Sequence, residues 1–205
     1  MKKRKIVLSC LLSLSFILGN MITPADAYSQ NNVGDSVDGP EEAANDAYVH
    51  YDQDNCSWTF GTSMVEKTVE LTEGQFLLKS FKNKLTGQQY LTDGQPGSEF
   101  SIKVDGTVHT GKNGNWSYVT QHTENLDLGS ILLVIELQNE ALAVKRNYII
   151  YPQTGVIEEY STFTNRKNSS VSFSEPSVFQ QNLLSDRVSN TDFLYMSGGY
   201  PEGFS

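Results

Sequence analysis

The sequence predicts an all-β fold, arranged as an antiparallel sandwich, and three observations support this. Apolar and polar residues alternate with a period of two along residues 64–71. Turn-forming pairs such as Glu73-Gly74 and Asp105-Gly106 recur at short spacing. No window after Ser57 carries a helical stripe over three turns. Many short strands separated by close turns are typical of a β-sandwich.

The first expected strands lie in residues 64–104. In 64–71, Val65, Lys67, Val69 and Leu71 share one face. The Glu73-Gly74 turn leads into a strand rich in Phe and Leu over 76–81, and residues 83–87 form the next tight connection. Residues 100–104 alternate again before Asp105-Gly106, which is a strong hairpin signal.

The later expected strands begin with the continuous apolar run 131–135, which predicts a strand buried on both faces. Residues 142–151 and 156–163 then predict a hairpin of β-branched and aromatic residues. Pro152 presets the φ of its turn, and Gly155 can take the left-handed conformation that closes it. Apolar residues at 171, 173, 178 and 179 continue the pattern.

The first 27 residues have the layout of a secretory signal peptide. A basic start at 2–5 precedes an apolar run at 6–18, and Ala25-Asp26-Ala27 forms a cleavage site. The apolar run is shorter than the roughly 20 residues that span a bilayer. We therefore expect a secreted protein that has no membrane contact after cleavage.

Two segments are expected in the mature chain. Residues 28–56 are polar and acidic and predict a flexible leader, in which Pro40-Glu41-Glu42 can start one short helix. Residues 57–205 predict a single sandwich domain, since a chain of this size can bury one core.

Charge and cysteine content narrow the function classes. The chain of 205 residues carries a net charge of −9, which becomes more negative once the basic start is removed. Such a chain does not attract nucleic acid or anionic membranes, so a neutral partner is expected. Of the two cysteines, Cys10 lies in the signal peptide, and Cys56 alone cannot form an intrachain disulfide.

The adjacent acids Glu158 and Glu159 raise the question of a catalytic pair. Neighbours on a strand point to opposite faces, whereas a retaining glycosidase holds two carboxyl groups about 5 Å apart. We therefore interpret both glutamates as solvated strand surface.

No metal, cofactor or nucleophile is expected either. His50, His109 and His122 lie in separate segments without metal-ligand spacing. Residues 52–55 (Asp-Gln-Asp-Asn) offer alternating oxygens but lack the later Gly and Glu of a calcium loop, so a polar turn is expected. Cys56 has no evident base beside it, and no phosphate loop or nucleophile elbow occurs.

Three stretches carry a resemblance to a known family. They are "SWTFGTSMVEKTVELTEGQFLLKSFKNKLTG" (57–87), "YIIYPQTGVIEEYSTFTN" (148–165) and "TDFLYMSGG" (191–199). Together they resemble the N-terminal β-supersandwich domain, a galactose-mutarotase-like fold, of family 36 glycoside hydrolases, the α-galactosidase group, or of a related carbohydrate-active enzyme family. The resemblance runs from about Asn55 to Ser205.

In that family the sandwich precedes a (β/α)₈ barrel that carries the catalytic carboxylates and needs about 250 residues. The resemblance therefore implies a non-catalytic module that packs on a barrel and shapes its substrate entrance, the barrel being encoded beyond Ser205. The alternative is a free-standing secreted protein that binds carbohydrate or another surface.

A sugar site is the remaining hypothesis. Trp58 is expected in the core, where large aromatic residues usually lie. Two interpretations of Trp116 stay open: core packing, or a stacking platform for a galactoside or other α-glycoside, exposed by the loop 111–114. In the second case its hydrogen-bonding neighbours are Asn113, Asn115 and Tyr118.

Overall fold

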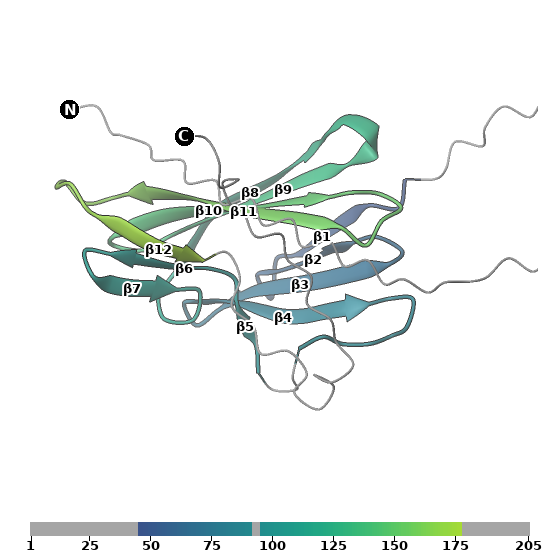
Figure 1. Ribbon diagram of the computed structural model, residues 1–205, viewed down its shortest axis with the longest axis horizontal. Coiled ribbons are helices and arrows are strands. Elements are labelled where there is room, and N and C mark those ends of the chain that lie inside the picture. Colours follow the sequence, from purple (N-terminus) through teal and green to yellow (C-terminus); the bar gives the residue numbers. More distant parts are fainter. Residues whose placement is uncertain (1–44, 92–94, 178–205) are drawn as a thin grey trace, which may run out of the picture.

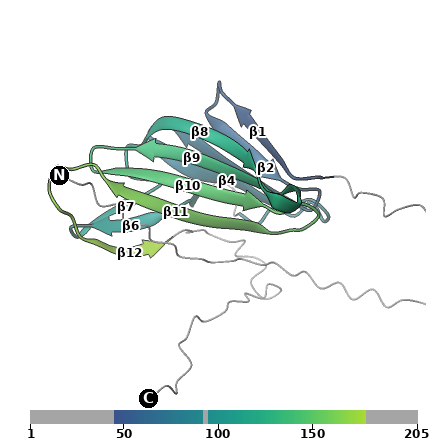
Figure 2. The ribbon, with the colours of Figure 1, turned by 90° about the horizontal axis from the view of Figure 1, so that it is seen from above.

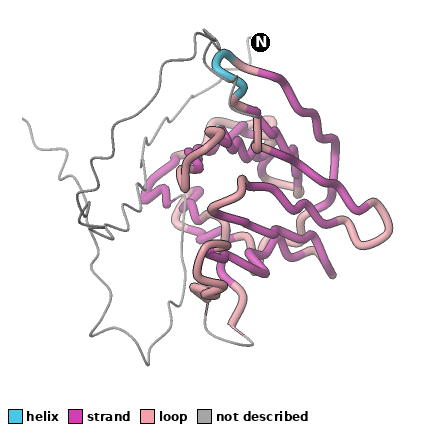
Figure 3. Tube along the Cα trace, turned by 90° about the vertical axis from the view of Figure 1, so that its right-hand side faces the viewer, coloured by secondary structure: helices cyan, strands magenta, loops and turns pink. Residues whose placement is uncertain are grey.

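The computed structural model describes residues 45–91 and 95–177. In this part the chain is antiparallel β-structure, with one short 3₁₀ turn at Asp127–Gly129 (Figure 3). The prediction of an all-β sandwich is confirmed. None of the described segments forms a helix long and apolar enough to cross a membrane.

The strands form two main sheets and one small sheet (Figures 1 and 2). The five-stranded sheet follows chain order: β1 (Tyr48–Asp52), β2 (Ser57–Gly61), β3 (Val65–Thr72), β4 (Gln75–Asn83) and β5 (Gly97–Ser98). The four-stranded sheet has the order β11 (Ile157–Asn165), β10 (Leu142–Ile150), β9 (Ile131–Gln138) and β8 (Ser117–Asn125). The small sheet has the order β12 (Phe173–Ser177), β6 (Ser101–Val104) and β7 (Thr107–Thr110).

The core lies between the layers. Figure 1 shows the four-stranded sheet above β2–β5, with β12, β6 and β7 at one end. Alternate residues of each strand point inward. The fully buried apolar side chains include Trp58, Phe60, Phe76, Phe100, Leu133, Ile135, Leu137 and Tyr148. In β9 the consecutive residues 133–135 of the predicted apolar run 131–135 are buried, whereas residues 131 and 132 are half-buried.

Strand β8 lies at the edge of its sheet, and all but one of its residues are exposed. Its pairing with β9 shifts register between Tyr118 and Thr120, which marks a β-bulge. Beyond it, Gln121 and Thr123 pair with Ile135 and Leu133 and so share their sheet face.

The predicted glycine hairpins are confirmed. Glu73 and Gly74 have φ values of 48° and 73°, and Asp105 and Gly106 have 48° and 82°. A positive φ at both central residues is the geometry of a type I′ turn, whose twist matches that of the flanking strands.

The β10–β11 turn differs from the prediction. Gln153, not Gly155, has the positive φ, at 58°. The Thr154 hydroxyl closes this turn, because it donates to the Tyr151 carbonyl at 2.8 Å and accepts from the Val156 amide at 3.1 Å. The hydrogen bonds of the Thr154 hydroxyl therefore close the turn, a role that was predicted for Gly155.

The predicted boundary between leader and sandwich is wrong. β1 falls within residues 28–56 and pairs along its whole length with β2. Tyr51 stacks on Trp58 at 5.0 Å between ring centroids, so an aromatic contact supports this strand. The predicted signal peptide, the helix at 40–42 and residues 178–205 lie outside the described residues.

The polar turn predicted at residues 52–55 is confirmed. Asp52 Oδ1 accepts hydrogen bonds from the amides of Asp54 (3.1 Å) and Asn55 (3.2 Å). Its Oδ2 accepts from the Asn55 side chain at 2.7 Å, so these oxygens serve the turn itself.

A pair of glycine variants tests the packing. A β-carbon on Gly111 would lie 2.3 Å from the Phe76 carbonyl oxygen, whereas one on Gly155 would meet nothing within 4 Å. We expect Gly111→Ala to lower the free energy of unfolding by about 1–3 kcal/mol. Gly155→Ala should change it by less than about 1 kcal/mol. Urea denaturation measures both, and equal midpoints would contradict the close approach at Gly111.

Candidate functional site

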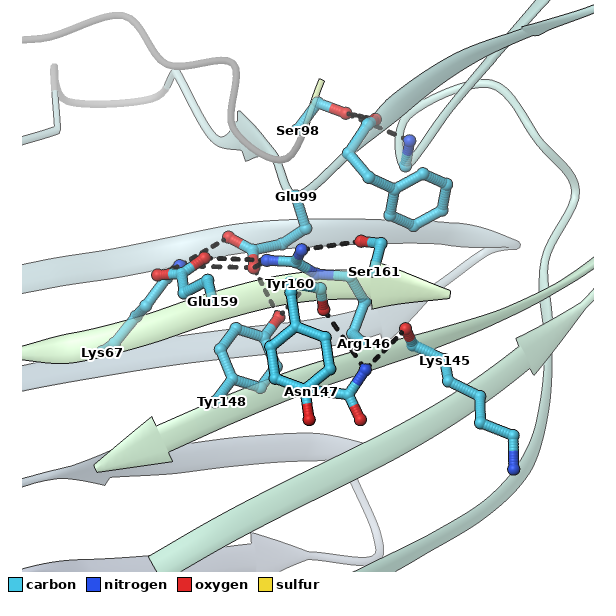
Figure 4. Close-up of polar contacts among 12 residues, drawn as sticks. Lys67, Ser98, Glu99, Lys145, Arg146, Asn147, Tyr148, Glu159, Tyr160 and Ser161 are labelled. Carbon is cyan, nitrogen blue, oxygen red and sulfur yellow. Dashed lines mark hydrogen bonds and ion pairs between the residues drawn. The ribbon is translucent and has the colours of Figure 1, made fainter. Parts of the chain in front are cut away.

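Six polar side chains meet between the sheets and form what we call the core charge cluster (Figure 4). They come from β3, from the segment that joins β5 to β6, and from β10 and β11. All but one are essentially inaccessible to solvent, and the exception keeps 15% of its side-chain surface exposed. The members are Lys67, Glu99, Arg146, Tyr148, Glu159 and Ser161.

Strand periodicity brings the cluster together. Lys67 lies between Val65 and Val69 on the inward face of β3. Arg146 and Tyr148 are two residues apart on β10, so both point inward. The antiparallel register sets them opposite Ser161 and Glu159 on β11. The paired strands β10 and β11 therefore supply one cation, Arg146, and one acid, Glu159, close together, and β3 in the facing sheet supplies the second cation.

The charges form a closed ring of four ion pairs. Lys67 Nζ lies 2.6 Å from Glu159 Oε1 and 3.1 Å from Glu99 Oε1. Arg146 Nη2 lies 2.7 Å from Glu159 Oε2 and 3.1 Å from Glu99 Oε2. Each carboxylate thus contacts both cations, and the two positive charges balance the two negative ones.

Tyr148 completes the cluster. Its hydroxyl donates to Glu99, and its ring centroid lies 5.2 Å from Lys67 Nζ and 4.9 Å from Arg146 Cζ. Arg146 Nη1 also donates to Ser161 Oγ at 2.8 Å. The negative face of an aromatic ring attracts cations, so the ring adds to the attraction of the acids.

The pKa shifts within the core charge cluster argue against a catalytic role for its carboxylates. Burial would raise the pKa of Glu99, but Lys67, Arg146 and the Tyr148 hydroxyl bring it below its ordinary value. Burial raises the pKa of Tyr148 well above its ordinary value, against the opposing charge of Arg146. A general acid at neutral pH needs a carboxyl pKa shifted upward, whereas Glu99 is held ionised.

The interpretation of Glu158 and Glu159 needs one correction. The two side chains do diverge, and Glu158 accepts a hydrogen bond from Tyr151 at 2.7 Å. Glu159 is not solvated surface, because its carboxylate lies in the ring of ion pairs. The missed signal was Lys67, a cation at a core-facing position, which requires a buried acid as partner.

A second feature, the end groove, lies where three loops converge. They are the β7–β8 loop (111–116), the β9–β10 turn (139–141) and the segment after β11, which begins at Arg166. The groove is open to solvent and has a volume of about 790 Å³. Its lining is His109, Asn113, Gly114, Asn115, Ser117, Gln138, Asn139, Glu140, Ala141 and Arg166.

Hydrogen bonds fix the walls of the end groove. Asn139 Oδ1 accepts from the amides of Ala141 (2.9 Å) and Leu142 (2.8 Å), and its Nδ2 donates to the Gly114 carbonyl at 2.9 Å. Arg166 donates from its amide to the Ala141 carbonyl and from Nη1 to the Asn139 carbonyl. The groove therefore has a defined shape without a ligand.

Two of the predicted sugar-binding residues line this groove and two do not. Asn113 and Asn115 are in its walls. Tyr118 is 38% exposed but packs against Tyr51 and Trp58, with centroids 6.2 and 5.8 Å apart. The predicted set is thus divided between the groove and the aromatic contact beside β1.

Trp116 is core, and the idea that its loop exposes the ring is wrong. The residue is 3% exposed, and its Nε1 donates to the Thr110 carbonyl at 2.8 Å. Its ring packs edge-on against Phe100 at 5.1 Å. A β-carbon on Gly114 would lie 2.0 Å from Nε1, so the glycine lets the loop cover the indole. Trp58 is fully buried, as predicted.

The histidines lie apart, on β1 (His50), β7 (His109) and β8 (His122). In the described ranges no three His, Cys, Asp or Glu side chains gather as metal ligands. Cys56 is half-buried, and burial raises the pKa of its thiol. At neutral pH it is therefore a thiol rather than a reactive thiolate.

Comparisons with known proteins give no match: no family model fits this chain, and no curated protein or solved structure is similar to it.

Removing one charge tests the ring of ion pairs. We expect Glu99→Gln to lower the free energy of unfolding by about 3–5 kcal/mol, because it leaves two buried cations with one acid. The matched control is Glu136→Gln, whose pair with Lys145 at 2.9 Å is partly exposed and should contribute less than about 1 kcal/mol. Equal urea midpoints for the two variants would contradict a structural role for the ring.

The lowered pKa of Glu99 predicts an acid sensitivity. Its unfolded value is about 4.3 and its folded value is lower, so the folded state binds fewer protons. The stability that the ionised Glu99 carboxylate contributes to the fold is fully present above the unfolded pKa. It is lost as the pH falls through the folded pKa. We expect stability to decline below about pH 4.3. The decline should be shallower in Glu99→Gln, and parallel curves for the two proteins would refute this.

Proposed function

We propose that this chain is a non-catalytic β-sandwich module of a secreted, α-galactosidase-like glycoside hydrolase. In this proposal it packs on a catalytic barrel and helps to shape the substrate entrance. One observation supports the proposal that the module is not catalytic. Glu99 and Glu159, the carboxylates that meet inside the sandwich, are each paired with two cations, so neither is available as acid, base or nucleophile.

The positions of the family-like segments support the proposal. Residues 57–87 form β2–β4, and residues 148–165 cover the end of β10 and all of β11. Lys67 from the first segment pairs with Glu159 from the second at 2.6 Å. The resemblance therefore involves two halves of one sandwich that contact each other. The third segment, 191–199, lies outside the described residues.

Charge and leader sequence agree with this role. The first 27 residues have the features of a secretion signal, and the net charge of −9 favours an uncharged partner. A neutral glycan outside the cell fits both features.

An activity assay tests the non-catalytic part. We expect the purified chain to give no turnover of an aryl α-galactoside, because residues 45–91 and 95–177 hold no free pair of facing carboxyl groups. Turnover that disappears in both Glu158→Gln and Glu159→Gln would overturn the proposal. The Glu136→Gln protein, purified identically, controls for a contaminating glycosidase.

The gene tests the modular part. An open reading frame that continues beyond the Ser205 codon with about 250 residues of βα alternation would support a following barrel. An immediate stop codon would contradict it. That outcome would favour the second candidate, a free-standing secreted protein that binds carbohydrate or another surface, for which the polar end groove is the supporting observation.

A further inference from the structure

We propose that the end groove is a binding site for a neutral, polyhydroxylated ligand, a mono- or disaccharide, held by amide side chains. The groove belongs to the sandwich itself, so the proposal holds with or without a barrel. It assigns Gln138 and Asn115 as the principal contacts, with Glu140 and Arg166 as further polar groups of the lining.

The groove offers polar groups that the fold does not use. The side-chain amides of Asn115 and Gln138 make no hydrogen bond to any described residue. Glu140 and Arg166 form no ion pair within the described ranges. The amides of Asn115 and Gln138 and the carboxylate of Glu140 are therefore open to a ligand. Arg166 uses Nη1 for the Asn139 carbonyl and keeps further N–H donors for a ligand. Asn139 and Asn113 hold the loops in place.

The chemistry of these groups matches adjacent hydroxyls. A side-chain amide presents a donor and an acceptor together, and each sugar hydroxyl is also both. A carboxylate accepts and a guanidinium donates, so Glu140 and Arg166 complement the two roles of a neighbouring hydroxyl pair. The two available amide side chains, Asn115 and Gln138, can thus bind several hydroxyls at once.

Charge selects an uncharged ligand. The positive charge of Arg166 is offset by Glu140 within the same lining, and the chain as a whole carries −9. An anionic sugar would gain little from Arg166 and would be repelled by the net charge. The volume of about 790 Å³ lies within the range of small-ligand sites, roughly 300–1,000 Å³.

The affinity should be weak. The groove lining contains no Trp, Tyr or Phe, and Trp116 is buried beneath Gly114. Hydrogen bonds that replace water in an open groove each contribute little. We therefore expect a Kd near 1 mM.

The test is a titration of the full secreted chain with methyl α-galactoside, methyl α-glucoside and galacturonate, followed by amide chemical shifts. Saturating shifts should occur in residues 111–116 and 138–141 with at least one neutral sugar. Galacturonate should bind more weakly. Gln138→Ala and Asn115→Gly should each weaken binding about tenfold, which corresponds to 1.4 kcal/mol.

The variants are chosen to keep the fold. Asn115 has a φ of 48°, a conformation that glycine adopts easily, and Gln138 has no bond to lose. The matched control is Gln153→Ala, an exposed glutamine in the turn at the opposite end of β10. Its binding should equal that of the unchanged protein. Unaltered urea midpoints establish that all three variants fold.

Three results would overturn the proposal. One is no saturable shift with either neutral sugar up to about 100 mM, a hundred times the expected Kd. Another is tighter binding of galacturonate, which would make the groove an anion site. The third is saturable binding that Gln138→Ala and Asn115→Gly leave unchanged.

Discussion

The ring of ion pairs around Arg146 constrains the whole sandwich. Removing four charges from water costs several kcal/mol per ion, and only a complete set of partners offsets that cost. Lys67 comes from one main sheet, Arg146 and Glu159 from the other, and Glu99 from the segment between β5 and β6. A one-residue slip of β3 would turn Lys67 outward and leave both acids short of a cation. The ring therefore specifies how the two sheets face each other.

Strand β10 connects the core charge cluster to the end groove. β10 begins at Leu142, directly after the turn that lines the groove, and reaches the ring at Arg146. Asn139 fastens that turn to the β7–β8 loop through the Gly114 carbonyl. Groove walls that are attached to a rigid, fully paired strand lose little conformational freedom on binding, which favours recognition by a few polar groups.

The sequence was sufficient for features that depend on neighbouring residues. Period-two patterns located β3 and β6, and the Glu73-Gly74 and Asp105-Gly106 pairs located two hairpins, whereas β1 was missed. It was insufficient where the determining contact is distant. Glu159 looks like surface until Lys67, 92 positions earlier, is seen to face it. The glycines before Trp116 suggest a loop that leaves its ring exposed. In the structure Gly114 instead lies against the indole, where any side chain would collide with the ring.

The bulge in β8 has a consequence for how the molecule behaves at high concentration. A nine-residue edge strand offers a row of unused backbone groups on which the strand of another molecule can align. The shift between Tyr118 and Thr120 interrupts the even spacing of those groups. Glu124 adds a charge that two molecules meeting edge to edge would have to bring close together. The irregularity thus favours a protein that remains dispersed while its polar loops stay accessible.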